Sequence, residues 1–186
     1  MRTISRKLAA LNAAKVLKRG GLIAHYTATL PGVAASPKSA KAINRLCSFK
    51  QRQGPFLLLA DSIQTALGQV RIFTPALRRL VKDSWPGPVT IIVPAKPGLP
   101  RQCYDKGNMA IRVDASLQTR QLAKACGGLL LSSSLNRRGK ISVNPDRKTH
   151  CRLHHHLSLS LAGEPGTGKA STIVRVWGND FTTIRS

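Results

Sequence analysis

The sequence contains very few acidic residues. Only seven of its 186 residues are Asp or Glu, and Glu164 is its single glutamate. The aspartates are scattered along the chain: Asp61, Asp83, Asp105, Asp114, Asp146 and Asp180. Catalysis by a pair of carboxylates, or a metal site built from several acidic ligands, therefore has little material to draw on.

Cysteines and long apolar runs are also scarce. The four cysteines stand at Cys47, Cys103, Cys126 and Cys151. Their spacing contains no C-x-x-C pair, which argues against a zinc ribbon or a thioredoxin-type site, and they are too sparse for a disulfide scaffold. We therefore expect a reducing, cytoplasmic location. No uncharged apolar run approaches the ~18 to 20 residues of a membrane span, so no membrane association is expected.

Positive charge is what the sequence has in abundance. Thirty Lys and Arg stand against seven acidic residues, which gives a net charge of +23. This imbalance favours anionic partners such as nucleotides, nucleic acid or phosphorylated ligands. Aromatic residues make up only 4% of the chain and do not alternate with basic ones as a base-stacking surface would. Contact with a phosphate backbone is thus expected without sequence readout.

The spacing of apolar residues predicts helices that alternate with strands. Helices are expected over 5–18, from Ser36-Pro37 to about Lys50, after Asp61, from Thr74-Pro75, and from Asp114 to Cys126. Strands are expected over 22–24, 56–60, 89–93, 109–113, 129–132, 171–176 and 181–184. The alternation predicts an α/β or α+β sheet domain. Since no repeat, low-complexity tract or linker composition is found, we expect residues 1–186 to form a single domain.

A glycine-rich run near the C-terminus almost matches a phosphate-binding P-loop. Gly163 to Lys169 has the spacing, but Ala170 stands where the Mg²⁺-binding hydroxyl would be. β-branched residues follow the run, whereas a P-loop needs a helix there. We therefore favour a flexible glycine-rich loop over a nucleotide hydrolase built on this run.

Histidines gather at His150 and at 154–156, close to Cys151. Successive residues of a regular element cannot all point at one ion, and no acidic ligands stand nearby to complete a shell. We favour a solvated basic loop, and the sequence predicts no metal site.

Hydroxyl groups follow one of the predicted strands. Ser132, Ser133 and Ser134 are succeeded by Asn136, without the G-x-S-x-G pattern of a serine nucleophile. Short hydrogen-bonding groups at the C-terminal edge of a sheet are typical of ligand binding in α/β folds. We therefore expect binding here and no covalent catalysis.

Two sets of cations stand out. Arg112 interrupts an otherwise apolar strand, and a guanidinium inside a sheet needs an anion, which is either an internal partner or a ligand carboxylate. With so few acidic residues in the chain, we favour the ligand. Lys50 and Arg52 end a predicted helix, where cations complement the helix dipole. They could instead form a fixed pair that binds phosphate or carboxylate. Spacing alone favours the dipole interpretation.

Taken together, these segments resemble the YrdC/TsaC family of threonylcarbamoyl-AMP synthases over nearly the whole chain. The resemblance is carried by Gly21-Leu22-Ile23-Ala24 with Thr27, Lys50-Gln51-Arg52, Ser84-Trp85-Pro86-Gly87-Pro88-Val89-Thr90, Ala110-Ile111-Arg112-Val113, Ser132-Ser133-Ser134-Leu135-Asn136 with Gly139, Ser171-Thr172-Ile173-Val174 and Ile184-Arg185. The W-P-G-P-V-T and S-T-I-V segments, in this order, are specific.

The resemblance implies a twisted mixed sheet with helices around a large basic cavity. It also implies a nucleotidyltransferase that converts L-threonine, bicarbonate and ATP to threonylcarbamoyl-AMP and pyrophosphate. The product would pass to downstream transferase proteins, which modify the adenosine next to the anticodon in tRNAs that read codons beginning with A. Mg²⁺ would arrive with ATP.

The family pattern assigns residues to both substrates. Thr27, Arg112, Ser132 and Ser171 would hold L-threonine. Lys50, Arg52, Ser134, Asn136 and Arg185 would face ATP. No covalent catalytic residue is implied, because a carbamate formed on the threonine amine can attack the α-phosphate directly.

The sequence also departs from the family pattern. The first motif, roughly Y-P-T-E-x-x-[FY]-G in the family, is the stretch from His25 to Gly32 here, and the loop after Arg52 is shorter. Arg137 and Arg138 replace small residues, and Arg175 replaces an aspartate. The synthase remains our first hypothesis, and these changes motivate an alternative one, a catalytically diverged member of the family that binds double-stranded RNA or acts in rRNA maturation.

Overall fold

The structure is a computed structural model that describes the backbone of residues 2–186 and the side chains of residue 9 and of residues 11–186. Its helices are α1 (Arg2–Lys18), α2 (Ala40–Lys50), α3 (Ile63–Gly68), α4 (Pro75–Ser84), α5 (Leu117–Ala125) and α6 (Arg147–Arg152), with a 3₁₀ turn at Arg101–Cys103. Its strands are β1 (Ile23–His25), β2 (Gly32–Ala35), β3 (Leu57–Ala60), β4 (Val89–Pro94), β5 (Tyr104–Asp105), β6 (Asn108–Val113), β7 (Leu129–Ser134), β8 (Leu159–Ser160), β9 (Thr172–Trp177) and β10 (Asp180–Arg185).

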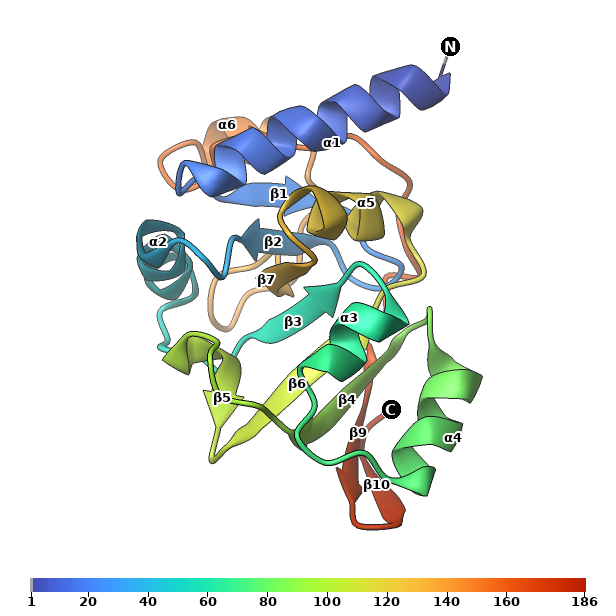
Figure 1. The fold of residues 1–186 in the computed structure, drawn as a ribbon. Helices are drawn as coiled ribbons and strands as arrows, with labels where there is room; N and C mark the ends of the chain where they lie inside the picture. The colour runs from blue at the N-terminus through green and yellow to red at the C-terminus, as the bar shows by residue number, and fades with distance from the viewer. Residues whose placement is uncertain (1) are drawn as a thin grey trace.

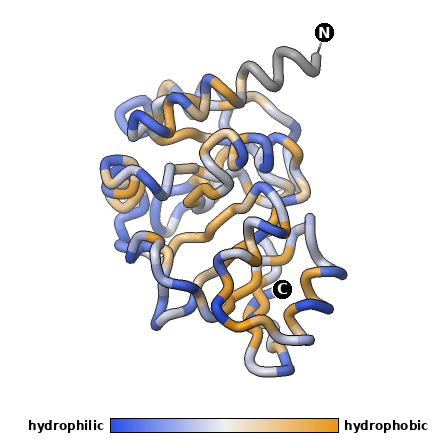
Figure 2. Tube along the Cα trace, in the orientation of Figure 1, coloured by the Kyte–Doolittle hydropathy of each residue, from blue (hydrophilic) through white to orange (hydrophobic). Residues whose placement is uncertain are grey.

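The strands form one mixed sheet (Figure 1), in the order β10-β9-β4-β6-β3-β7-β2-β1-β8, with β5 paired to β6. Strand β3 lies in the middle, parallel to β6 and antiparallel to β7. Leu58 and Leu59 belong to two different apolar cores and are both fully buried, so the apolar run of β3 is covered on both faces, as the sequence predicts. Figure 2 shows apolar stretches along these central strands.

Cross-strand partners point to the same face of a sheet, so the registers define its two faces. On the first face, Leu58 lies opposite both Ile111 and Leu131, and all three belong to a large apolar core. Residues of α2, α3 and α4 complete that core: Leu46, Ala66 and Leu77 are among them.

The second face is covered over only part of its area. Here Leu59 and Leu130 pack with Leu17 of α1 and Leu122 of α5, and α1 lies beside α5. Among the described residues, this smaller core includes none from β4, β6, β9 or β10. Arg112 lies opposite Leu59 and therefore projects from this same face. The polar groups described below gather there.

Several predicted helix starts were wrong by a few residues. The capping side chains are Ser39, Ser62 and Ser116, in place of Ser36, Asp61 and Asp114. In each case a serine nearer the helix accepts the backbone N–H that a cap must satisfy. The cap at Thr74 is confirmed.

The chain also contains elements that the sequence did not predict. Strands β2, β5 and β8 and helix α6 lie outside the segments that were predicted as helix or strand. Strand β2 reads Gly-Val-Ala-Ala and is buried throughout, so it shows no polar-apolar alternation to reveal it. None of the described helices is long and apolar enough to cross a membrane.

Candidate active site

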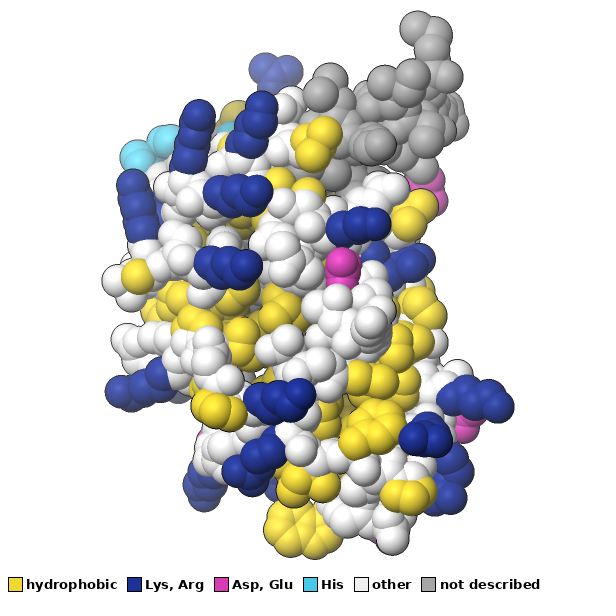
Figure 3. Space-filling view, in the orientation of Figure 1, with side chains coloured by type: hydrophobic (Ala, Val, Ile, Leu, Met, Phe, Trp, Pro, Cys, Tyr) yellow, Lys and Arg dark blue, Asp and Glu magenta, His cyan; other side chains and the backbone are white. Residues whose placement is uncertain are grey.

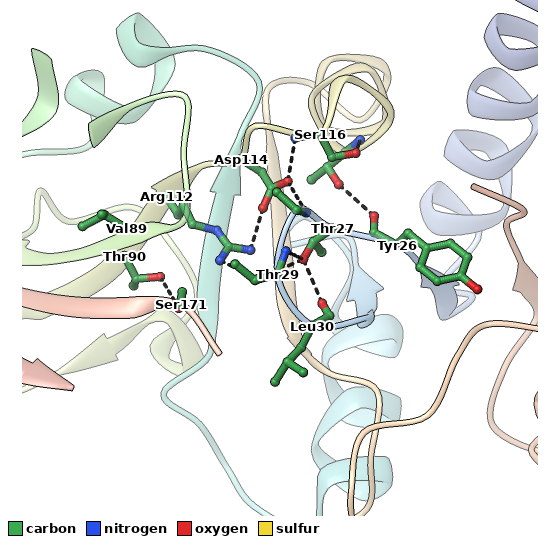
Figure 4. Close-up of polar contacts among 12 residues, drawn as sticks. Tyr26, Thr27, Thr29, Leu30, Val89, Thr90, Arg112, Asp114, Ser116 and Ser171 are labelled. Carbon is green, nitrogen blue, oxygen red and sulfur yellow. Dashed lines mark hydrogen bonds and ion pairs between the residues drawn. The ribbon is translucent and has the colours of Figure 1, made fainter. Parts of the chain in front are cut away.

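The segment after β1 folds into a tight turn that carries the first predicted threonine ligand. Thr27 Oγ1 donates to the carbonyl of Leu30 at 2.8 Å and accepts from the backbone N–H of Thr29 at 3.1 Å. The two threonine hydroxyl oxygens lie 3.1 Å apart. Arg112 Nη1 donates to Thr29 Oγ1 at 2.9 Å (Figure 4), so this turn is attached directly to β6.

Arg112 has an internal anionic partner. Its Nη2 lies 2.7 Å from Asp114 Oδ2, and the side chains of Arg112 and Asp114 are 3% and 0% exposed. The expectation that a ligand would be the main anion facing Arg112 was therefore wrong. Arg112 keeps one buried donor, Nε, which has no partner among the described residues. Burial lowers the pKa of Arg112, and the adjacent Asp114 carboxylate opposes that shift.

Asp114 connects the end of β6 to the turn. Its Oδ1 accepts from the backbone N–H groups of Ala28 and Ser116, each at 2.9 Å. Asp114 was predicted to cap a helix, and sequence reasoning missed its role as partner of Arg112. A signal was present, because residues two apart on a strand share a face.

Ser171 and Arg185 meet at the start of β9. Ser171 Oγ lies 3.0 Å from Thr90 Oγ1 of β4, and Figure 4 shows this pair close to Arg112. Arg185 Nε and Nη2 donate to the Ser171 carbonyl at 3.2 and 2.8 Å. Because Arg185 also lowers the pKa of Arg112, the two guanidinium groups are electrostatic neighbours. The structure thus brings together a predicted threonine residue and a predicted ATP residue.

Lys50 joins the end of α2 to the loop after β7. Its Nζ donates to the carbonyls of Ser134 and Asn136 at 2.9 and 2.5 Å and to Asn136 Oδ1 at 2.7 Å. Ser134 Oγ donates to the same Oδ1 at 2.6 Å. Three predicted ATP residues therefore form one network, which the interpretation of Lys50 as a helix-dipole cation does not explain. Burial, assisted by the nearby Arg52, lowers the pKa of Lys50 to about 8.

Arg52 is directed at the loop that precedes β3. Its Nη1 donates to the Pro55 carbonyl at 2.6 Å, and its guanidinium carbon lies 4.6 Å from the centroid of the Phe56 ring. No hydrogen bond joins Arg52 to Lys50, Ser134 or Asn136, and electrostatics alone link it to Lys50. Ser132 lies on β7, between Ala34 and Leu57 of the neighbouring strands, and is buried.

The glycine-rich run from Gly163 to Lys169 packs against the turn at Thr27. The N–H groups of Thr167 and Gly168 donate to the carbonyls of Ala28 and Thr29 at 3.0 and 3.3 Å. Strand β9 follows the run, so the helix that a P-loop needs is absent there, as the sequence predicts. The run is held by backbone hydrogen bonds, whereas a flexible loop was expected.

The arrangement suits the positioning and neutralisation of anions. Cations and hydroxyls form two clusters, one around Arg112, Ser171 and Arg185 and one around Lys50, Ser134 and Asn136. Asp114 is the one carboxylate in the contacts described above. Preorganised donors of this kind stabilise charge that develops during a reaction. Among the described residues, no three His, Cys, Asp or Glu side chains are grouped so that they could hold a metal ion.

Residues 15–186 match the family model named for Sua5, YciO and YrdC and described as telomere recombination. The chain belongs to the Sua5/YciO/YrdC family. This confirms the family resemblance found in the sequence. The departures from the family pattern at Arg137, Arg138 and Arg175 all lie at exposed positions.

Curated relatives in this family carry the name threonylcarbamoyl-AMP synthase. The one from Thiobacillus denitrificans is 35% identical over 126 residues, which cover 66% of this chain and 67% of that protein. The one from Stenotrophomonas maltophilia is 32% identical over 170 residues, which cover 88% of this chain and 91% of that protein.

Solved structures of the family share the fold. P. abyssi Sua5 complexed with L-threonine superposes with a TM-score of 0.87 at 21% identity, over 96% of this chain and 54% of that one. E. coli YciO gives a TM-score of 0.85 at 20% identity, over 97% of this chain and 89% of that one. The present chain thus spans about half the length of the Sua5 protein. These matches confirm the predicted mixed α/β fold.

Proposed function

We propose that this chain is a threonylcarbamoyl-AMP synthase. It would combine L-threonine, bicarbonate and ATP into threonylcarbamoyl-AMP, pyrophosphate and water. The observation that carries the proposal is the buried Nε donor of Arg112, which has no partner among the described residues and lies beside Arg185 and the turn that carries Thr27. The function predicted from the sequence agrees with the names of the curated relatives.

We propose the following substrate contacts. Thr27, Arg112, Ser132 and Ser171 hold L-threonine, and the unpartnered Arg112 Nε donates to its carboxylate. Lys50, Arg52, Ser134, Asn136 and Arg185 face ATP. Mg²⁺ enters bound to the phosphates of ATP, since the described residues offer no acidic cluster for a resident ion.

The reaction needs no covalent enzyme intermediate. The threonine amine adds to CO₂, the carbamate oxygen attacks the α-phosphate, and pyrophosphate leaves. Both reactants are anions, so the protein contributes by holding them together and by offsetting their repulsion. The Arg112–Asp114 pair has no net charge, which leaves Arg185, Lys50 and Arg52 to neutralise the phosphates.

The test is a product assay on the purified chain with L-threonine, bicarbonate, ATP and Mg²⁺. Mass spectrometry is expected to detect threonylcarbamoyl-AMP and pyrophosphate only when all three substrates are present. A chain that binds ATP and threonine but forms no product would contradict the proposal.

We further propose that RNA, including tRNA, contacts the basic surface. Lys and Arg side chains are spread over the face shown in Figure 3, with few acidic side chains among them. A pocket of about 490 Å³ offers one contact point, and its lining includes Arg137, Lys140, Arg152, His155 and His156 but no acidic residue. Arg137 Nη2 lies 2.6 Å from His156 Nε2, which holds that guanidinium at the pocket.

A duplex RNA probe tests the RNA contact. Affinity is expected to fall steeply with salt, and Arg137→Ser is expected to weaken binding and to reduce the salt slope by about one. Arg79→Ser, which removes an exposed charge from α4, is the matched control. Equal losses in the two variants, or binding that is insensitive to salt, would contradict the proposal.

We also propose a single domain over residues 1–186, a cytoplasmic location, and delivery of the product to transferase proteins that act on tRNA. One continuous sheet supports the single domain. All four cysteines are free thiols, as is usual in a reducing compartment.

A further inference from the structure

His25, at the end of β1, is a buried histidine to which the proposed function gives no role. Its side chain is fully buried. Nδ1 lies 3.1 Å from the carbonyl oxygen of Tyr26. A carbonyl can only accept, so Nδ1 carries the proton, and Nε2 presents a lone pair. Nε2 is buried and has no hydrogen-bond partner among the described residues.

The surroundings of His25 keep the imidazole neutral. Burial lowers its pKa to about 4. Two charged groups act on it: the Asp114 carboxylate raises the pKa and the Arg112 guanidinium lowers it. These two groups form an ion pair, and their effects on the pKa of His25 act in opposite directions. At neutral pH, Nε2 is therefore an acceptor without a donor, which is costly for a buried polar atom.

The sheet places His25 beside Ser132. His25 lies opposite Gly32, Gly32 opposite Ser134, and Ala34 opposite Ser132. All of these positions share one face, the face from which Arg112 also projects. A Cβ atom on Gly32 would lie 3.0 Å from His25 Nε2 and 3.0 Å from Ser132 Oγ. The imidazole and the hydroxyl thus converge over a residue that has no side chain.

We propose that His25 is a positioning residue that acts through Ser132. When L-threonine is bound, Nε2 accepts a hydrogen bond from the Ser132 hydroxyl, which leaves the two lone pairs of Ser132 Oγ as acceptors. These lone pairs receive an N–H of the substrate amino group and so orient the nitrogen that takes up CO₂. This inference rests on the proposed function, in which Ser132 contacts L-threonine. Hydrogen bonds of this kind commonly tighten only when substrate is bound.

His25 does not act as the general base in this scheme. A group with a pKa near 4 is too weak a base to take a proton from the substrate amino group efficiently at neutral pH. Its contribution is to orient the Ser132 hydroxyl through a hydrogen-bond acceptor. A phenylalanine at this position has no acceptor, whereas the side-chain amide oxygen of a glutamine provides one.

A double-mutant cycle on L-threonine binding, measured by calorimetry, tests the proposal. Ser132→Ala and His25→Phe are each expected to weaken binding about tenfold, the effect of one lost hydrogen bond. The double variant is expected to bind no worse than Ser132→Ala, because both changes remove the same interaction. His25→Gln, which restores an acceptor, is expected to recover most of the affinity. Independent, multiplicative losses would overturn the proposal.

Spectroscopy of the unmodified chain provides a readout that does not depend on variants folding. The ¹⁵N resonance of His25 Nε2 is expected at an unprotonated position, with a shift towards a hydrogen-bonded position when L-threonine is added. A proton on Nε2 in the free protein would overturn the assignment. Neither experiment requires turnover, so the two proposals can fail separately. If His25 and Ser132 are coupled in L-threonine binding but the chain makes no product, the proposed function is refuted and this inference stands.

Discussion

Arg112 of β6 and Asp114, the first residue after that strand, form a buried ion pair, with Arg112 Nη2 2.7 Å from Asp114 Oδ2. The pair does more than neutralise charge. Arg112 also holds Thr29, and Asp114 also holds the backbone of Ala28, so both partners fix the turn that carries Thr27. The proposed threonine site therefore depends on an internal salt bridge as well as on the residues proposed to contact L-threonine.

Arg112→Leu is expected to destabilise the fold, because it leaves Asp114 buried without a partner. Breaking a buried pair costs about 3–5 kcal/mol. Arg175→Leu, which changes an exposed arginine on β9, is the control and is expected to cost within about 0.5 kcal/mol. Urea unfolding measures both. An Arg112→Leu chain as stable as the control would show that the pair contributes little.

ATP use is expected to decline as the pH rises through about 8. The folded-state pKa of Lys50 is about 8, below its ordinary value of 10.5. Above pH 8 the folded protein loses this charge, so kcat/KM for ATP, which reports the free enzyme, falls by up to about tenfold per pH unit. Lys50→Arg keeps its charge and is expected to give a flat profile to pH 9.5. Identical profiles for the two chains would contradict the role of Lys50.

Deprotonation of Lys50 is expected to lower the use of ATP but to raise the stability of the fold. Because burial penalises charged Lys50, this cost is present below pH 8 and is relieved between pH 8 and 10.5, where the unfolded chain still binds the proton. Free energies of unfolding, compared with those of Lys50→Met across this window, are expected to show that the contribution of Lys50 becomes more favourable as pH rises. A contribution that decreases would contradict the lowered pKa.

Gly166→Ala is expected to weaken the binding of L-threonine. The added Cβ would lie 2.3 Å from the Thr27 carbonyl oxygen and 2.4 Å from the Ala28 carbonyl carbon, distances that backbone cannot tolerate. The glycine-rich run must then move off the turn. Gly68→Ala, where nothing lies within 4 Å, is the matched control. Calorimetric titration with L-threonine should separate the two, and equal affinities would refute a role for the run at this site.

Local sequence signals predicted most of the fold. The central strands and the C-terminal hairpin follow from apolar runs, and the start of α4 follows from its capping residue, Thr74. Short elements were not predicted. Strand β2, for example, is uniformly buried, so its four residues carry no periodicity. The starts of α3 and α5 were misplaced because an aspartate stands one or two residues before the serine that caps each helix.

The site was harder to predict than the fold, because its contacts join distant parts of the chain. Family motifs located Lys50 and Asn136, but only the structure shows that they bond to each other across 86 residues of sequence. His25 is a departure from the family motif, and its significance depends on the missing side chain of Gly32 on the neighbouring strand. No local pattern carries that information.

Synthesis with ¹³C-bicarbonate tests the central claim most directly. The chain would be incubated with L-threonine, ATP, Mg²⁺ and labelled bicarbonate, and the adenylate product examined by mass spectrometry. The account predicts threonylcarbamoyl-AMP heavier by one mass unit, with the label in the carbamoyl carbon and pyrophosphate released in equal amount. An unlabelled adenylate, or ATP consumption that does not depend on bicarbonate, would contradict it.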